Sequence, residues 1–436
     1  MEYLSSNKIA VVDLGKADVR EEELEDSLVQ ERIGGAGITT ALYRRFEAED
    51  PIVVGSGLLT GTLVPGSALG LVTAKSPLTG KVCHAPLTLY LGMELKFSGF
   101  DYIVIKGASA KPVYLWLHDG IPDIQPAEDV WGLDTWAATD DIRLTLGDDL
   151  IQVLTIGPAG ESGSPLAQLI VNYWGSGDRW GLGGLFGSKK CKGIAVRGMG
   201  LLEISDPEGF IVRCQSLLSE IKKGPWAGKK GLPDMAAALG EGDVAGWLDP
   251  IIHRHKSCFN TPFASNTFVY LDEDPRLFRE PDGAEPGFLI NDLYGLMSFK
   301  KLGLSAVEAC RVLKKSARMG FDPAAVSELN LKLGNKDGES ILKSLPGLQG
   351  ILECVGQTPF SPWAPLKPIF ADFGVPADEA WWTRRQALAY IFGIHPIFAL
   401  MAPELSEEKL LELAGIGTGM EFTGELLEQV IQDISQ

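Results

Sequence analysis

The chain has 436 residues, of which 45% are hydrophobic and 22% charged, and its formal net charge is −18. A chain of this length is too long for one compact core and predicts two or three domains. Its acidic surface would repel nucleic-acid phosphates and anionic lipids, so we expect neither a nucleic-acid partner nor a membrane-surface role. The N-terminus has no secretory pattern, and no stretch reaches the roughly 18 apolar residues of a membrane-spanning helix. These features predict a cytoplasmic protein.

The cysteines lie far apart and form no CxxC pair. There are six, at positions 83, 191, 214, 258, 310 and 354. This spacing fits neither a small disulfide framework nor a zinc site. We expect reduced, mostly buried thiols, as in cytosolic proteins.

The first 200 residues consist of short strand-like runs separated by Gly- and Pro-rich turns. The predicted strands cover residues 9–12, 69–73, 102–105, 113–117, 153–156 and 194–196. Such aliphatic and β-branched runs are typical of strands, and long helical periods are scarce between them. The acidic run Glu21–Glu25 is interpreted as a solvated helix face. We expect a β-rich domain over residues 1–205.

The second half has a helical character. Ser305 and Glu308 form a capping-box pattern that opens a helix reaching about Gly320. Residues 406–413 and 423–434 are expected to form two further helices. The proline-rich segment 358–376 is interpreted as a crossover or linker, and Asp206–Pro207 as a domain boundary. The expected class is therefore α+β, with a mainly helical region over residues 206–436.

Seven segments of the first half, in order, carry a family resemblance. They are Leu58–Ser67, Thr73–Gly80, Glu94–Gly107, Lys111–Trp116, Val130–Gly132, Ile156–Glu161 and Gly181–Lys189. Together they resemble the N-terminal domain of the aldehyde ferredoxin oxidoreductase family. The resemblance implies a tungsten or molybdenum enzyme that oxidises aldehydes, with two pterins holding the metal and a [4Fe–4S] cluster passing electrons to ferredoxin.

The second half resembles the family more loosely. His253–Cys258 is similar to the cluster-binding segment, Met319–Asp322 to the end of a first pterin motif, and Ile391–His395 to a second. Leu410–Ala414 resembles the closing helical region. The chain ends at Gln436, short of the usual family length. We expect a divergent member with a shortened C-terminal region.

The cluster ligands expected from the resemblance are depleted. A cubane needs four thiolates, and the equivalent positions here are Cys258, Thr261, Ser265 and His395. Since one thiolate of four is present, a [4Fe–4S] cluster is not expected and these positions are interpreted as vestigial. Cys258 is expected to be a buried thiol and His395 a core histidine.

The pterin contacts are depleted in the same way. The family's phosphate-binding arginine falls at Leu69, its loop asparagine near Pro86, and its two motif aspartates at Ala317 and Tyr390. Apolar residues and a phenol supply no carboxylate acceptor for pterin N–H groups. From these losses we expect no cofactor, with a tungsten or molybdenum bis-pterin as the alternative.

Arg179, Gly181 and Gly183 remain as a vestigial pterin loop, since an arginine beside glycines suits phosphate binding. Trp180 occupies a position where the family has glycine and could fill the cofactor's space. The competing interpretation is that Arg179 caps a cluster of carbonyl groups or pairs with an acid such as Asp178 or Glu161.

Three functions follow from these residues. The first is a non-catalytic scaffold or partner subunit that pairs with an active family homologue, a redox subunit or itself. The second is an active oxidoreductase with an atypical pterin site. The third is a small-molecule binder that uses the vacated cavity. An open cavity lined by Tyr390, His395, Trp180 and His84 would favour the third, and one collapsed around Trp180 would favour the first.

Overall fold

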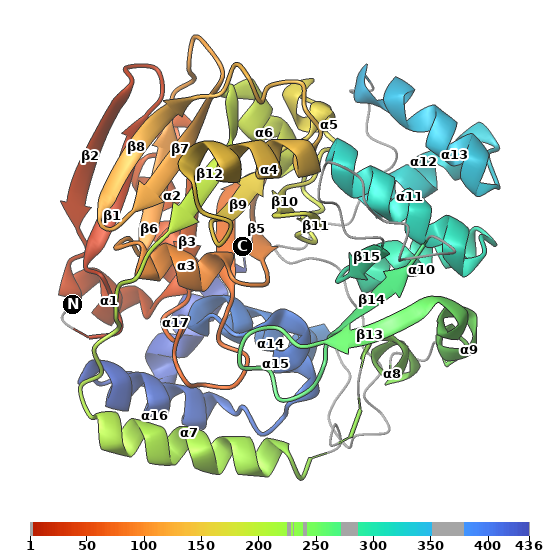
Figure 1. The fold of residues 1–436 in the computed structure, drawn as a ribbon. Coiled ribbons are helices and arrows are strands. Elements are labelled where there is room, and N and C mark those ends of the chain that lie inside the picture. Colours follow the sequence, from red (N-terminus) through yellow and green to blue (C-terminus); the bar gives the residue numbers. More distant parts are fainter. Residues whose placement is uncertain are drawn as a thin grey trace.

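A computed structural model describes residues 3–224, 228–229, 231–238, 242–271, 287–350 and 379–435. Its N-terminal half holds two six-stranded sheets, and helices follow in the second half (Figure 1). The predicted α+β class is confirmed. The predicted proline-rich linker at residues 358–376 lies outside the described residues, and the domain division after residue 205 stays a prediction.

The first sheet has the strand order β2-β1-β6-β3-β4-β5. Its strands are β1 (Lys8–Asp13), β2 (Asp18–Glu23), β3 (Ile52–Ser56), β4 (Gly70–Lys75), β5 (Val82–Leu87) and β6 (Tyr102–Lys106). Strand β1 runs parallel to β6, and the other neighbours are antiparallel. Alternate side chains of β1 enter different core clusters, Ile9 and Val11 on one face and Ala10 and Val12 on the other. Because both faces are buried, the strand is a continuous apolar run.

The acidic residues that follow β1 form an edge strand, so the prediction of a helix face at Glu21–Glu25 was wrong. Strand β2 pairs antiparallel with β1, with Lys8 opposite Glu23, and leaves most of its side chains exposed. Charged side chains on an edge strand discourage pairing with another chain. Helix α1 (Asp26–Arg32) begins only after Glu25.

The second sheet has the order β11-β10-β9-β12-β7-β8. Its strands are β7 (Val113–His118), β8 (Ile121–Pro126), β9 (Gln152–Thr155), β10 (Ile170–Val171), β11 (Trp174–Gly175) and β12 (Cys191–Arg197). Val12 and Val54 of the first sheet share a buried cluster with Leu115, Leu154 and Ile194 of the second. The two sheets therefore pack face to face over a common core.

The first half also contains more helix than we expected. Its helices after α1 are α2 (Gly35–Arg45), α3 (Leu91–Phe97), α4 (Thr135–Leu146), α5 (Pro158–Glu161) and α6 (Leu182–Ser188). Helix α2 packs on the first sheet and meets a C-terminal helix at its first residue. A Cβ on Gly35, whose φ is +46°, would lie 1.9 Å from the Tyr390 carbonyl oxygen. Only glycine allows this approach.

The second half is mainly helical. Its helices are α7 (Pro207–Ile221), α8 (Gly231–Ala238), α9 (Val244–Leu248), α10 (Leu293–Lys301), α11 (Ala306–Met319), α12 (Pro323–Leu333), α13 (Gly338–Ser344), α14 (Glu379–Phe392), α15 (Pro396–Met401), α16 (Glu407–Thr418) and α17 (Gly424–Ile434). The predicted capping box of α11 is confirmed, and the helix ends at Gly320 in the left-handed conformation. The predicted helices at residues 406–413 and 423–434 correspond to α16 and α17.

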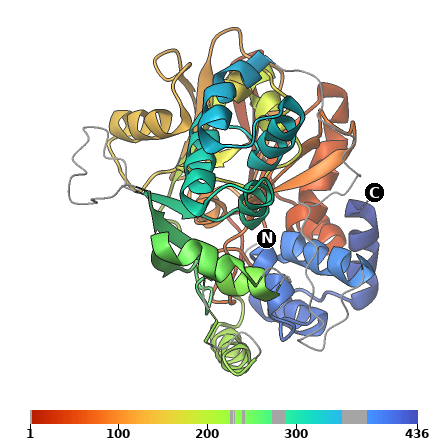
Figure 2. The same cartoon turned by 90° about the vertical axis from the view of Figure 1, so that its right-hand side faces the viewer.

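Figure 2 shows α10–α13 in front of the sheets and the last helices gathered with α7 at one end of the molecule. A third sheet of β13 (Ile252–Lys256), β14 (Asn266–Tyr270) and β15 (Gly287–Ile290) lies between these groups (Figure 1). In the described part of the chain, no helix combines the length and apolar character needed to cross a bilayer.

Candidate functional site

Arg179 lies between β11 and α6, where it joins the second sheet to two helices of the second half. Its guanidinium is buried and forms ion pairs with Asp292, at 2.5 Å, and with Asp322. The Tyr294 ring lies 4.8 Å from the guanidinium carbon. The predicted pairing with an acid is thus correct in kind, but the acids are Asp292 and Asp322 and not the neighbours Asp178 or Glu161.

The two acids are helix N-caps, which explains their positions. Asp292 accepts the backbone N–H of Gly295 at the start of α10, and Asp322 accepts that of Ala324 at the start of α12. Burial raises the pKa of Asp322, and Arg179 opposes this rise. Two carboxylates face one guanidinium, so Arg179 has no unbalanced positive charge to offer a phosphate.

Asp178, which was considered only as an ion-pair partner of Arg179, holds the glycine-rich loop. Its buried carboxylate accepts the backbone N–H groups of Leu169 at 3.3 Å, Trp180 at 2.9 Å and Leu182 at 3.1 Å. Burial raises the pKa of Asp178 to about 7, against the effect of these hydrogen bonds. An aspartate adjacent to a glycine-rich turn was the available signal for this role.

Gly181 and Gly183 serve close packing in the same loop. Gly181 has a φ of +74°, and a Cβ there would lie 2.6 Å from the Pro165 carbonyl oxygen. A Cβ on Gly183 would lie 2.9 Å from the Gln168 carbonyl oxygen. The two glycines let the protein's own backbone approach closely at these positions. Assignment of Arg179, Gly181 and Gly183 to a cofactor loop stays a prediction.

The residues expected to face a pterin are packed within the core. Trp180 and His84 are each 1% exposed, and Tyr390 is fully buried. The Nδ1 atom of His84 lies 2.8 Å from Thr73 Oγ1, and its Nε2 atom lies 3.3 Å from the Ile434 carbonyl oxygen of α17. Burial lowers the pKa of His84 to about 4, so the ring is neutral.

Cys258 and His395 are brought together, although they lie 137 positions apart in the chain. Cys258 follows β13, and His395 precedes α15. Asn266 Nδ2 lies 3.2 Å from the Cys258 sulfur, and Ser265 Oγ lies 3.6 Å from it. Burial would raise the pKa of the Cys258 thiol, but the charge and hydrogen bond of the His395 ring, with these two donors, lower it to about 7.

The pair supplies only two candidate metal ligands. Within the described residues, no group of three or more His, Cys, Asp or Glu side chains is arranged to hold a metal ion. The expectation that Cys258 is a buried thiol is confirmed by its 4% exposure. His395 is a core histidine, but its Nδ1 atom is buried and has no hydrogen-bond partner among the residues that the structure describes. Asn266 was not expected at this centre.

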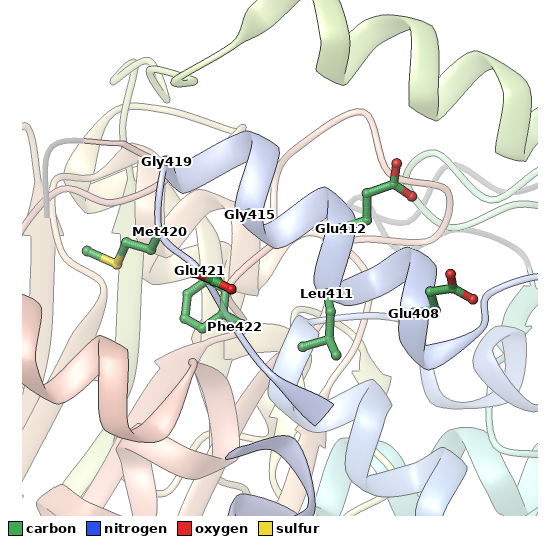
Figure 3. A pocket seen from close by; sticks show the side chains of 8 residues that line it. All are labelled: Glu408, Leu411, Glu412, Gly415, Gly419, Met420, Glu421 and Phe422. Atoms are coloured by element: carbon green, nitrogen blue, oxygen red, sulfur yellow. The ribbon is translucent and has the colours of Figure 1, made fainter. Parts of the chain in front are cut away.

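A second feature lies on the surface beside α16. It is a hollow of about 530 Å³ that we call the acidic groove, lined by Glu408, Leu411, Glu412, Gly415, Gly419, Met420, Glu421 and Phe422. Glu408, Leu411 and Glu412 project from α16, and Met420, Glu421 and Phe422 come from the segment that follows it (Figure 3). Apolar and acidic side chains are therefore interleaved in one exposed hollow.

Residues 9–198 match the family model described as the aldehyde ferredoxin oxidoreductase N-terminal domain. The tungsten-containing aldehyde ferredoxin oxidoreductase of Pyrococcus abyssi is 33% identical over 274 residues, which are 61% of this chain and 44% of that protein. Residues 9–198 therefore carry the N-terminal domain of the aldehyde ferredoxin oxidoreductase family. The predicted recognition is confirmed, and the chain matches less than half the length of this relative.

Two further relatives and one solved structure extend the comparison. The enzyme of the same name from Pyrococcus furiosus is 32% identical over 52% of this chain and 39% of its own length. The aliphatic sulfonate oxidoreductase WOR-like subunit of that organism is 28% identical over 50% of this chain and 39% of its length. The active-site complex BamBC of benzoyl-coenzyme A reductase has a TM-score of 0.68 at 20% identity, covering 80% of this chain and 61% of that chain. This last likeness concerns the fold alone.

The expectation that the chain needs no cofactor is wrong. Its relatives at 32–33% identity are named as tungsten-containing proteins. We expected no cofactor because the side chains that would contact the pterins are replaced. In the family that the chain resembles, however, the pterins are expected to hold the metal, and protein side chains are not. Arg179 is neutralised by two carboxylates, and Trp180, His84 and Tyr390, which were expected to line a vacated cofactor cavity, are buried, so these side chains do not fit a pterin as they lie.

Proposed function

We propose that this chain is a subunit of a tungsten-dependent oxidoreductase assembly, in which it binds a partner subunit and does not itself carry out the oxidation. The observation that carries the proposal is the packing around Trp180. The resemblance places four side chains near the cofactor. Trp180, His84 and Tyr390 are at most 1% exposed, and His395 is 6% exposed. Substrate needs an accessible space beside the reacting centre, and these four side chains are almost closed to solvent.

The names of the relatives agree with a subunit role. One is called a WOR-like subunit, and the solved structure is of a complex between BamB and BamC. An active family homologue or a redox subunit is therefore the first partner to seek, and a second copy of this chain is the alternative. The third interpretation, a binder in the vacated cavity, loses its support because the four residues that would line it are buried.

The acidic groove is the surface we assign to the partner. Leu411 and Met420 are partly buried and would lose further apolar surface on docking. Glu408 and Glu421 have no ion-pair partner among the described residues, whereas Glu412 pairs with Arg213. An amphipathic segment with Lys or Arg beside its apolar positions would match this pattern.

Charge reversal in the acidic groove tests the proposal. The double variant E408K/E421K should reduce recovery of the partner about tenfold when the tagged full chain is purified anaerobically from its native host, because like charges would then meet. The matched control is D129K/D149K, which reverses two exposed acids in the loops that flank α4. If E408K/E421K recovers as much partner as the parent chain, the acidic groove is not the partner-binding surface.

Oxidation of aldehydes by this chain alone is the second candidate, and the names of the tungsten-containing relatives favour it. The same preparation distinguishes the two. We expect aldehyde oxidation only in fractions that also contain a partner subunit. If the chain purifies alone, carries tungsten and oxidises an aldehyde, the second candidate replaces the first.

A further inference from the structure

A cavity of about 230 Å³ lies between α4, β11 and the third sheet. We call it the aromatic pocket, because its walls include Tyr90, Trp136, Tyr173 and Trp174. It is separate from the Arg179 centre and from the acidic groove, and the proposed function makes no use of it.

The aromatic walls hold one another in place. The Trp136 ring meets Tyr173 edge-on at 5.3 Å and Trp174 at 5.5 Å between centroids. The Trp136 Nε1 atom donates to the Tyr173 carbonyl oxygen at 2.8 Å. Tyr90, Tyr173 and Trp174 nevertheless remain partly exposed. Such edge-to-face contacts fix the rings while their accessible surfaces stay available to another ring.

A hydrogen-bond network gives the pocket a rigid polar side. Arg143 donates to the Tyr173 hydroxyl and to the Asn172 side-chain oxygen, each at 3.0 Å. The Tyr173 hydroxyl in turn donates to Asp140 at 2.5 Å. Asn172 is only 7% exposed and also donates to Gln152 at 2.9 Å. These groups are satisfied by each other, so they position the aromatic walls without needing a ligand.

One cation at the pocket is Lys256, at the end of β13. Its side chain is exposed and forms no hydrogen bond or ion pair with the described residues. The charged lining residues are Arg143, Lys256 and Asp140, which leave the pocket with one net positive charge. The whole chain has a net charge of −18, so a positively charged pocket differs from the rest of the molecule. The positive charge favours a negatively charged ligand.

We propose that the aromatic pocket binds a small anion built on a single aromatic ring, with the ring between Tyr90, Tyr173 and Trp174 and the anionic group at Lys256. A dry cavity of roughly 150 Å³ accepts benzene, so about 230 Å³ accommodates a ring with one carboxylate. The anionic end lies toward solvent, where Lys256 is exposed, and the ring occupies the apolar side.

Benzoate is a suitable probe, titrated into the full chain by isothermal calorimetry. We expect it to bind about tenfold more tightly than benzyl alcohol, which lacks the charge, and than cyclohexanecarboxylate, which lacks the aromatic face. Equal binding of benzoate and benzyl alcohol would overturn the role of Lys256, and no benzoate binding up to about 10 mM would overturn the site.

Two variants locate the binding. K256Q should weaken benzoate about tenfold and leave benzyl alcohol unchanged, because it removes the charge and keeps the stem. The control K75Q alters another exposed lysine, on β4, and should change neither ligand. W174A should weaken both ligands, with its circular dichroism compared with that of the parent chain. Wild-type benzoate affinity in K256Q would refute the proposed placement.

Discussion

Replacing Arg179 with methionine is expected to lower the free energy of unfolding by about 3–5 kcal/mol. Asp292 and Asp322 would keep their buried carboxylates without the guanidinium that now pairs with both. The measurement is urea unfolding at neutral pH. The triple variant R179M/D292N/D322N should recover at least half of the loss, since it removes the uncompensated charges together with the cation.

The matched control for Arg179 is R318M. Arg318 pairs with Asp134 at 2.7 Å, but these side chains are 28% and 22% exposed. Its loss should cost less than about 1 kcal/mol because water solvates the remaining acid. Equal effects of R179M and R318M would contradict a buried ion-pair role. If R179M instead abolishes binding of added pyrophosphate without changing stability, Arg179 belongs to a phosphate site, as the sequence predicts.

Removing the Cys258 thiol is expected to change how stability depends on pH. Its pKa is about 7 in the folded chain and 9.0 in the absence of the fold. The folded state therefore favours the thiolate, and the resulting stabilisation is complete above pH 9 and is lost as the pH falls through 7. The contribution amounts to about 2–3 kcal/mol over this range.

In the parent chain, ionisation of Cys258 should make the free energy of unfolding rise between pH 6.5 and 9. The variant C258A should lack this contribution to the rise. The measurement is a series of urea unfolding curves at different pH values. The ultraviolet absorbance of the thiolate in the folded chain reports the ionisation of Cys258 directly. The variant C310A is the control, because burial raises the pKa of Cys310 above this pH range. Parallel pH profiles for C258A and the parent chain would show that Cys258 titrates as an ordinary thiol.

The sequence alone determined the features that depend on local chemistry. Ser305 and Glu308 form a capping box wherever the chain makes a helix there, because both partners lie within one turn. The apolar runs at residues 9–12 and 102–105 became central strands because such runs are stable when both faces are covered. The ordered motifs of residues 58–189 identified the family, since they preserve the turns and close approaches of one fold.

The tertiary structure alone decided which distant groups meet. Residues 21–23 of the acidic run became part of a strand because they pair with β1, and the local sequence does not encode this pairing. Arg179 found its acids 113 and 143 residues away, at the N-termini of α10 and α12. We predicted an acid closer in the sequence as the partner. A buried guanidinium instead pairs with whichever carboxylates the packing of the helices brings next to it.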